Sequence, residues 1–245
     1  MDPQNSIEVK NVKKEFSIHS RATSIKDLIV YRGKEVDRRK RTVLHDINFN
    51  VKKGESVGII GRNGSGKSTT LKLLTRILRP DEGTIETDGK ISCLIELGAG
   101  FHPDMTGREN VYINASIFGI THKEVNRRLE DIIEFSGIRP FIDERVRNYS
   151  SGMYLRLAFA VAINVDADIL LIDEILAVGD VQFQQKCVNK LQEMKENGVT
   201  IVFVTHDVGT AKRMCNRVIW IDDGCIREDG PADEVCDHYI KEMCQ

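Results

Sequence analysis

The stretch Gly61–Thr69, with the sequence GRNGSGKST, constrains this chain more than any other feature. It follows the apolar run Ser56–Ile60, which predicts a buried strand, and precedes Thr70–Leu74, whose apolar spacing is helical. The pattern G-x-x-x-x-G-K-[ST] between a strand and a helix predicts a loop whose backbone N–H groups wrap a phosphate chain. Lys67 is then expected to reach the β- and γ-phosphates of a nucleotide, and Ser68 to ligate Mg²⁺.

The partial positive charge at the start of the following helix would add to this attraction for an anion. The alternative is a glycine-rich turn that binds nothing, and the strand before it and helix after it argue against that. The loop therefore supplies these candidate nucleotide-binding residues: Gly61, Asn63, Gly64, Ser65, Gly66, Lys67, Ser68 and Thr69.

Length and composition suit one large α/β domain. The chain has 245 residues, 41% of them hydrophobic, and a net charge of −2, so no broad basic surface for nucleic acid is expected. No apolar run approaches the ~18 residues of a membrane span, and the polar N-terminus does not resemble a signal peptide. The six cysteines form no C-x-x-C pair and are expected to be reduced thiols, buried or incidental.

The order of the predicted elements divides the domain. A mostly helical block over 97–166 interrupts the strands, which predicts a helical lobe inserted into a core formed by 1–96 and 167–245. Thr106 and Glu109 have the spacing of a capping box. Strands are predicted over Ser6–Val12, Val43–Val51, Ser56–Ile60, Thr84–Thr87, Lys90–Glu96, Ala167–Ile172, Val199–Val204, Arg217–Asp222 and Cys225–Asp229. Helices are predicted from the phosphate loop to about Leu78 and over Asn110–Phe118, His122–Phe135, Gly152–Asn164, Phe183–Asn197, Val208–Cys215 and Ala232–Met243.

An unusual segment, 19–42, separates Phe16 from the second strand. Within it, Ile25–Val30 predicts a short amphipathic helix, and Arg38–Arg41 is a run of basic residues. Two interpretations stay open: a solvated insertion, or a basic element that faces a membrane surface or an anionic substrate.

A phosphate loop alone does not separate ATPases, GTPases and small-molecule kinases, but residues downstream do. Ile169–Ile172 is a near-continuous apolar strand that ends in Asp173 and Glu174. Asp173 is expected to hold the Mg²⁺ shell, and Glu174 can reach an attacking water as general base. The alternative is a surface Asp-Glu pair at the end of a strand. No N-K-x-D motif is present, which disfavours a GTPase.

Two further positions complete the candidate catalytic set. His206 follows the strand Val199–Val204, and the carboxyl ends of parallel strands meet at the ligand crevice. His206 could therefore contact the γ-phosphate, the alternative being a histidine with no catalytic role. Ser150, Ser151 and Gly152 precede a helix, where small hydroxyl residues can make a second anion site.

The order of phosphate loop, helical lobe with Ser150–Gly152, Asp173-Glu174 and His206 resembles the ATP-binding cassette (ABC) family over nearly the whole chain. The resemblance implies an α/β fold: a P-loop NTPase core of ABC type in one domain, 1–245, with an inserted helical subdomain and an N-terminal antiparallel β subdomain. It implies ATP and Mg²⁺ as cofactors and a head-to-tail homodimer. In such a dimer Ser150 and Gly152 would grip the γ-phosphate of the ATP on the partner chain. Asp180 would belong to the dimer-contacting D-loop, and Phe16 would stack on adenine.

Departures from the usual pattern narrow the resemblance. The signature is Tyr149-Ser150-Ser151-Gly152-Met153 instead of L-S-G-G-Q, and Glu96 or Leu97 stands where the family has a glutamine. These features, with the segment 97–110 and the long insertion after Phe16, are similar to cassettes that export O-antigen, capsule or teichoic acid. Some of those carry a C-terminal carbohydrate-binding domain, which this chain either lacks or has lost.

The resulting prediction is an ATPase subunit on the cytoplasmic face of the membrane, bound to two copies of a polytopic permease that exports a lipid-linked glycan, with no nucleic-acid partner. Phe101 and the basic run Arg38–Arg41 are expected to contact substrate or lipid, or to be structural. The rivals are a cassette for another lipid or a drug, a DNA-repair ATPase, disfavoured because no heptad run is present, and an ATP-holding protein without turnover.

Overall fold

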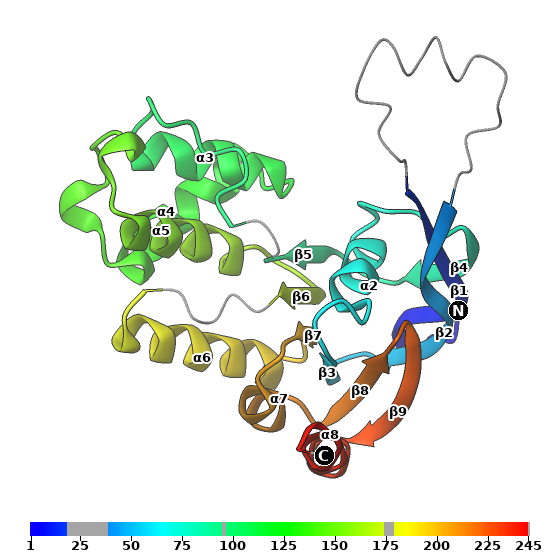
Figure 1. Cartoon of the computed structure of the whole chain (residues 1–245). Helices are drawn as coiled ribbons and strands as arrows, with labels where there is room; N and C mark the ends of the chain where they lie inside the picture. Colours follow the sequence, from blue (N-terminus) through cyan, green and yellow to red (C-terminus); the bar gives the residue numbers. More distant parts are fainter. Residues whose placement is uncertain (19–38, 95–96, 174–178, 245) are drawn as a thin grey trace, which may run out of the picture.

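The structure is a computed structural model that describes residues 1–18, 39–94, 97–173 and 179–244. It has three parts: an N-terminal β subdomain, a central core with a mixed sheet, and a helical lobe set apart from the β subdomain (Figure 1). The predicted helix Ile25–Val30 lies outside the described residues. No helix among the described residues is long and apolar enough to cross a bilayer.

The β subdomain is a three-stranded antiparallel sheet in the order β2-β1-β4. Its strands are β1 (Asn5–Ile18), β2 (Arg39–Lys52) and β4 (Glu82–Thr87). Strands β1 and β2 are longer than the sequence predicts, because they pair beyond the apolar stretch as far as Ile18 and Arg39. Residues 39–41 of the basic run therefore lie in a strand, which corrects their assignment to the insertion.

The core sheet has the order β5-β6-β7-β3-β8-β9. Its strands are β3 (Ser56–Ile60), β5 (Ile91–Cys93), β6 (Ile169–Asp173), β7 (Thr200–Val204), β8 (Arg217–Asp222) and β9 (Cys225–Pro231). All neighbours pair in parallel except β8 and β9, which form the predicted hairpin. Because β3 is central, the phosphate loop leaves the middle of the sheet. Strand β5 is shorter than the predicted Lys90–Glu96, of which residues 95–96 lie outside the described part.

Helices cover both faces of this sheet. They are α2 (Lys67–Leu74), α6 (Val181–Glu196), α7 (Val208–Met214) and α8 (Ala232–Met243). One buried cluster joins α6, α7 and α8 to one face, with Trp220 and Phe203 fully buried. The other joins α2 and the β subdomain to the opposite face. The thiols of Cys187, Cys215 and Cys236 are buried in the first cluster, as predicted for part of the cysteine set.

The helical lobe has its own buried cluster. It contains α3 (Gly107–Ile117), α4 (His122–Ser136), the 3₁₀ turns η1 (Arg139–Phe141) and η2 (Val146–Asn148), and α5 (Ser151–Ile163). The predicted capping box of Thr106 and Glu109 is confirmed. It starts α3 at Gly107, three residues before the predicted start. The lobe is linked to the core at both of its ends, through β5 and β6 (Figure 1).

Candidate nucleotide site

The phosphate loop turns sharply where β3 leaves the sheet. Gly61 has φ +151° and Gly66 has φ +112°, backbone conformations that residues with a Cβ atom rarely adopt. A Cβ on Gly61 would lie 2.1 Å from the carbonyl oxygen of Ile221, and one on Gly66 would lie 2.5 Å from Cδ2 of Leu44. Both glycines therefore let the loop lie against neighbouring strands, which fixes its path.

No side chain of the phosphate loop or of the first turn accepts from the N–H groups at the start of helix α2. Its N-cap is Gly66, no side chain caps it, and no acidic residue lies in its first turn. The first N–H groups of an α-helix lack partners inside the helix, so those of Lys67, Ser68 and Thr69 are available to an outside acceptor. The buried Ser65 hydroxyl also has no hydrogen-bond partner. This unfilled set of donors fits a bound phosphate group.

Lys67 brings a buried positive charge to the same place. Its side chain is only 9% exposed, and its Nζ donates to the carbonyl oxygens of Gly61 at 2.7 Å and Arg62 at 2.9 Å. Burial lowers the pKa of Lys67, and the charge of Asp173 opposes that shift. Burial disfavours the charged ammonium form of Lys67, and negatively charged phosphate oxygens next to it would offset that cost.

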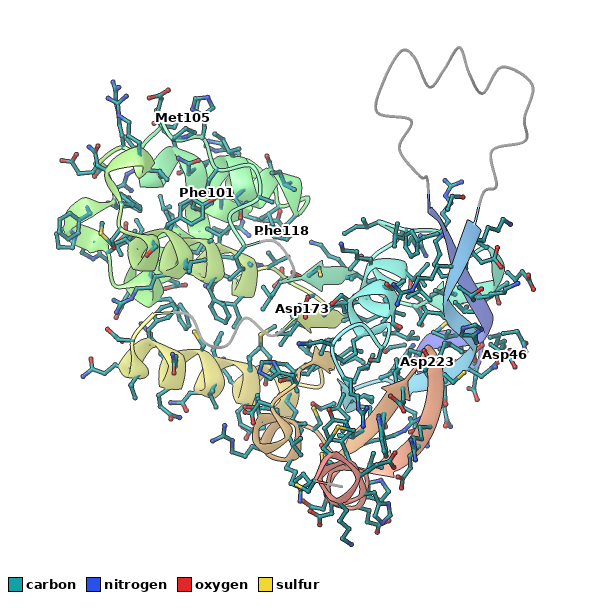
Figure 2. The ribbon with its side chains drawn as sticks, viewed as in Figure 1. Asp46, Phe101, Met105, Phe118, Asp173 and Asp223 are labelled. Carbon is teal, nitrogen blue, oxygen red and sulfur yellow. The ribbon has the colours of Figure 1, made fainter. Side chains whose placement is uncertain are left out.

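Asp173 ends β6 at the same edge of the sheet. It is level with Val204 at the end of β7, and Val204 is level with Ile59 near the end of β3. Figure 2 shows Asp173 between the helical lobe and the core. Burial raises the pKa of Asp173, while the charges of Lys67 and Lys72 oppose the shift. A divalent cation would favour the ionised carboxylate here.

A cavity of about 270 Å³ joins these groups. Its lining residues are Arg41, Val43, Asn63, Gly64, Gly66, Lys67, Ser68, Thr69, Asp173 and Val204. The structure therefore brings together Asp173 and six of the eight loop residues that the sequence predicts. Gly61 and Ser65 do not line the cavity, although both belong to the loop. Val43 and Val204 were not predicted as site residues, and Arg41 was predicted only within the basic run expected to contact substrate or lipid.

The donor set fits a magnesium nucleotide better than a bare metal ion. The described residues contain no group of three or more His, Cys, Asp or Glu side chains that could hold a metal. Ser68 and Asp173 both line the cavity and could offer two oxygen ligands, and Mg²⁺ usually completes its shell with water and substrate phosphates. The ion would therefore bind together with the nucleotide.

Phe16 lies beside this cavity but does not line it. It pairs with Arg41 across the β1–β2 ladder, is 39% exposed, and has the Lys14 Nζ 5.6 Å from its ring centre. Directly opposite residues of an antiparallel pair project from the same face. Phe16 therefore lies on the same face as Arg41, where a base could reach its ring.

The signature residues lie in the helical lobe, away from the phosphate loop of the same chain. Ser150 is the N-cap of α5, and its hydroxyl accepts from the N–H of Met153 at 3.2 Å. Ser150, Ser151 and Gly152 do not line the cavity. If they bind a nucleotide, it is not the one held by their own phosphate loop, which agrees with the head-to-tail arrangement that the resemblance implies.

The remaining predicted residues have mixed positions. Glu174 lies outside the described residues. His206 lies just beyond β7 and lines a separate cavity of about 750 Å³ between α6 and α7. Asp180, which the sequence places in the D-loop, caps α6 through a 2.9 Å bond from the N–H of Phe183 and pairs with Arg156 of α5. It therefore ties α6 to the helical lobe.

Phe101 is held within the lobe. Its ring packs edge-on against Tyr154 with centres 5.1 Å apart, and the Tyr154 hydroxyl donates to the Gly98 carbonyl at 2.9 Å. The amide of Asn114 donates to the Ala99 carbonyl at 2.6 Å. These contacts favour the structural interpretation of this loop over direct contact with substrate.

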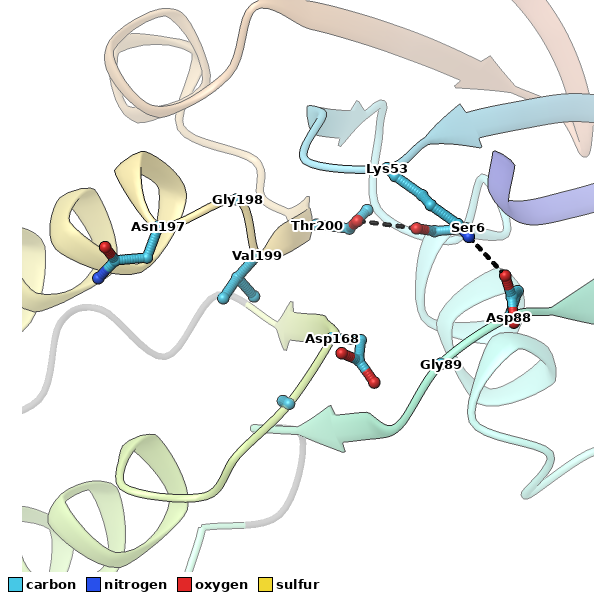
Figure 3. Close-up of a pocket in the computed structure, with 10 residues that line it drawn as sticks. Ser6, Lys53, Asp88, Gly89, Asp168, Asn197, Gly198, Val199 and Thr200 are labelled. Atoms are coloured by element: carbon cyan, nitrogen blue, oxygen red, sulfur yellow. Dashed lines mark hydrogen bonds and ion pairs between the residues drawn. The ribbon is translucent and has the colours of Figure 1, made fainter. Parts of the chain in front are cut away.

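The opposite edge of the sheet has a cavity with a different character (Figure 3). It measures about 420 Å³ and lies at the amino ends of β6 and β7. Its hydroxyl and charged side chains are already paired, Ser6 with Thr200 at 2.9 Å and Lys53 with Asp88 at 2.7 Å. Asp168 accepts from the N–H of Lys90 at 2.7 Å. The Ser6–Thr200 bond joins β1 of the β subdomain to β7 of the core, and Lys53, the cation that lines this cavity, is already paired.

Residues 44–177, just over half of the chain, match the family described as ABC transporter. The chain belongs to the ABC transporter family. Two solved structures share its fold. A dimeric ATP-binding cassette in a post-hydrolysis state with ADP and phosphate gives a TM-score of 0.73 at 24% identity over 92% of this chain and 98% of that one. An ATP-binding subunit of an ABC transporter gives 0.75 at 22% identity over 95% and 92%. The predicted fold class is confirmed, and the chain is an ATPase of this family.

Curated relatives of this ABC protein are named for export systems. The O-antigen export system ATP-binding protein RfbB of Klebsiella pneumoniae is 46% identical over 241 residues, 97% of this chain and 98% of the relative. RfbB of Myxococcus xanthus is 50% identical over 97% of this chain but only 56% of its own length. The teichoic acids export ATP-binding protein TagH of Listeria innocua is 40% identical over 95% of this chain and 69% of its own length.

Proposed function

We propose that this chain hydrolyses ATP to drive export of a lipid-linked cell-surface polysaccharide, of the O-antigen or teichoic acid class, from the cytoplasmic face of the membrane. The observation that carries the proposal is that relatives named for these two export systems match nearly the whole chain at 40–50% identity. The donor-rich cavity around Lys67 and Asp173 supports ATP as the energy source.

In this proposal the phosphate loop holds the triphosphate. The free N–H groups at the start of α2 and the Lys67 ammonium bind the β- and γ-phosphates, and Ser68 and Asp173 hold Mg²⁺. Glu174 acts as general base on the attacking water, and His206 contacts the γ-phosphate. Phe16 stacks on adenine, its position beside the cavity supporting that role.

Two copies of the chain would close on ATP head to tail. Ser150, Ser151 and Gly152 of one copy would then face the γ-phosphate held by the other, since they lie far from their own phosphate loop in the fold. Closing and opening would move the helical lobe against two copies of a separate membrane permease. The ion pair between Asp180 and Arg156 would transmit movement at the dimer contact to α5 of the lobe.

The test replaces Glu174 with Gln in cells that depend on the chain. We expect long polyprenyl-linked glycan to accumulate on the cytoplasmic side while surface glycan is lost, because ATP binds but is not hydrolysed. Glu196→Gln, at an exposed position on α6, is the matched control and should leave both pools unchanged. Unchanged pools in the Glu174 variant, with hydrolysis abolished in vitro, would refute the polysaccharide substrate and leave export of another lipid or small molecule.

The dimer is tested separately with purified protein. Glu174→Gln with ATP and Mg²⁺ should elute as a stable dimer, whereas wild type should return to monomer as it consumes ATP. A variant that stays monomeric at saturating ATP would contradict the head-to-tail mechanism.

A further inference from the structure

Arg41 is a cation that the ATP-binding motifs do not account for. It lies in β2 and lines the 270 Å³ cavity together with Lys67 and Thr69. Its side chain is exposed, and within the described residues no carboxylate or other acceptor pairs with it. An unpaired cation on the wall of an anion site is the chemistry expected of a ligand-binding residue.

The neighbouring lysines of the same sheet are all paired. Lys14 lies 3.1 Å from Asp81, Lys40 lies 3.0 Å from Glu15, and Lys13 lies 3.1 Å from Glu15. Lys40 is next to Arg41 in the strand, so it projects from the opposite face. Among the described side chains, these three neighbouring lysines are therefore neutralised by carboxylates, whereas Arg41, which lines the cavity, has no such partner.

The backbone that carries Arg41 is fixed against the phosphate loop. Two residues further on, the Val43 carbonyl oxygen lies 3.2 Å from the Cβ position of Gly66, and Val43 lines the same cavity. The N–H of His45 donates to the Gly224 carbonyl at 2.8 Å, which holds β2 on the core. Arg41 is thus positioned from a strand packed on the nucleotide loop.

Register decides which part of a nucleotide Arg41 would meet. Arg41 lies directly opposite Phe16 and shares its face, so the guanidinium is next to the surface proposed for the base. Lys67 and the start of α2 serve the β- and γ-phosphates at the other end. The phosphate nearest the base is the α-phosphate.

We propose that the Arg41 guanidinium binds the α-phosphate of the nucleotide, between the Phe16 ring and the phosphate loop. The inference rests on nucleotide binding at this site. Arg41 would donate from its planar fork to non-bridging oxygens and add a second cation to Lys67. ATP and ADP both carry an α-phosphate, so Arg41 contributes equally to the affinity for each and is indifferent to the base.

The experiment measures affinities of the whole chain for ATP and ADP, with Mg²⁺, by calorimetry. Arg41→Gln should weaken both by roughly tenfold, as expected for loss of a charge-assisted hydrogen bond. Arg41→Lys should restore part of the loss, because it keeps the charge without the fork. Lys40→Gln, on the opposite face, is the matched control and should stay within about twofold of wild type. Melting without nucleotide should be unchanged, since the Arg41 side chain makes no hydrogen bond or ion pair with the described residues.

The outcomes separate the alternatives. Equal affinities for wild type and Arg41→Gln would overturn the proposal, and so would a loss for ATP without a loss for ADP, which would place the guanidinium on the γ-phosphate. A changed ratio of ATP to GTP affinity, with no rescue by Lys, would also overturn it in favour of stacking on the base. Failure of wild type itself to bind ATP or ADP would refute the proposed function together with this assignment, a result distinct from a loss confined to the Arg41 variants.

Discussion

Helix α2 and the helices of the lobe begin in opposite ways. The lobe helices α3 and α4 start with reciprocal capping boxes at Thr106 and Thr121, and Ser150 caps α5. Among the α-helices of the described chain, α2 alone has neither a side-chain cap nor an acidic residue in its first turn. The lobe satisfies its helix ends internally, whereas α2 depends on a ligand to do so. The difference separates helices that are capped by their own sequence from a helix whose start is left open to an anion.

The largest expected effect follows from removing the cation of the α2 site. Lys67→Ala should lower ATP hydrolysis by roughly 10²–10³-fold, because the charge on the γ-phosphate is then left without its nearest preorganised donor. A phosphate-release assay at saturating ATP measures this. Lys72→Ala, an exposed lysine on the same helix, should change the rate by less than about threefold. Equal losses in both variants would show that general electrostatics, and not the position of Lys67, controls hydrolysis.

The second effect is stabilisation of the fold by a nucleotide whose phosphate oxygens accept from the N–H groups at the start of α2. ADP with Mg²⁺ at about 100 times its dissociation constant should stabilise the fold by roughly 2.7 kcal/mol, which raises Tm by about 5–10 °C in a chain of this size. Thermal unfolding with and without ligand measures the shift. The same ligand concentrations should give a much smaller shift in Lys67→Ala. A full shift in that variant would mean that ligand binding does not depend on the α2 site.

A smaller effect is expected at a lobe helix. Thr106→Ala removes the Thr106 hydroxyl that accepts from the Glu109 N–H at 3.2 Å and donates to its carboxylate. Stability should fall by about 1 kcal/mol, with the ATP affinity unchanged. Urea unfolding measures the loss, and Thr121→Ala on α4 should behave alike. Weaker ATP binding in either variant would show that the lobe and the α2 site are not independent.

The sequence predicted which residues gather around the cavity at the start of α2 better than it predicted the ends of the helices and strands. The phosphate loop and Asp173 were found because their chemistry depends on short local spacing. Helix α2 was predicted to reach Leu78, since Ile77 and Leu78 continue its apolar pattern. Instead Arg76 adopts φ +60°, and the N–H of Leu78 returns to the Lys72 carbonyl at 3.0 Å. The left-handed conformation of Arg76 ends the helix, and the spacing of apolar residues does not predict such a change of backbone conformation.

Arg41 shows why part of the site escaped prediction. In the sequence it belongs to a basic run, and the predicted strand began two residues later, at Val43. Its place in the cavity depends on pairing with Phe16, 25 residues earlier, and on the packing of β2 against Gly66. Alternation along β2 puts Arg41 and Val43 on one face and would have been the available signal. Register between distant strands is set by tertiary contacts, so one strand alone could not have fixed it.

The smallest effect concerns the stability that the nucleotide-free chain loses by burying the ionised Asp173 carboxylate. Burial raises the pKa of Asp173, so the folded chain binds that proton more tightly than the unfolded chain does. The ionised carboxylate therefore costs stability, and the cost is absent below the ordinary pKa of the side chain, 3.8, and fully present above the raised pKa. Asp173→Asn should then raise Tm of the nucleotide-free chain at pH 7.5 by about 2 °C, an advantage that shrinks as pH falls through this window. The same variant should lose Mg²⁺-dependent hydrolysis.

The matched control is Asp131→Asn, which removes an exposed carboxylate on α4. Asp168→Asn would be a poor control, because the Asp168 carboxylate accepts a hydrogen bond from the N–H of Lys90. If Asp173→Asn is instead less stable than wild type at pH 7.5, the attraction between Lys67 and the ionised Asp173 carboxylate outweighs the cost of burying that carboxylate. The two charges would then stabilise the nucleotide-free fold.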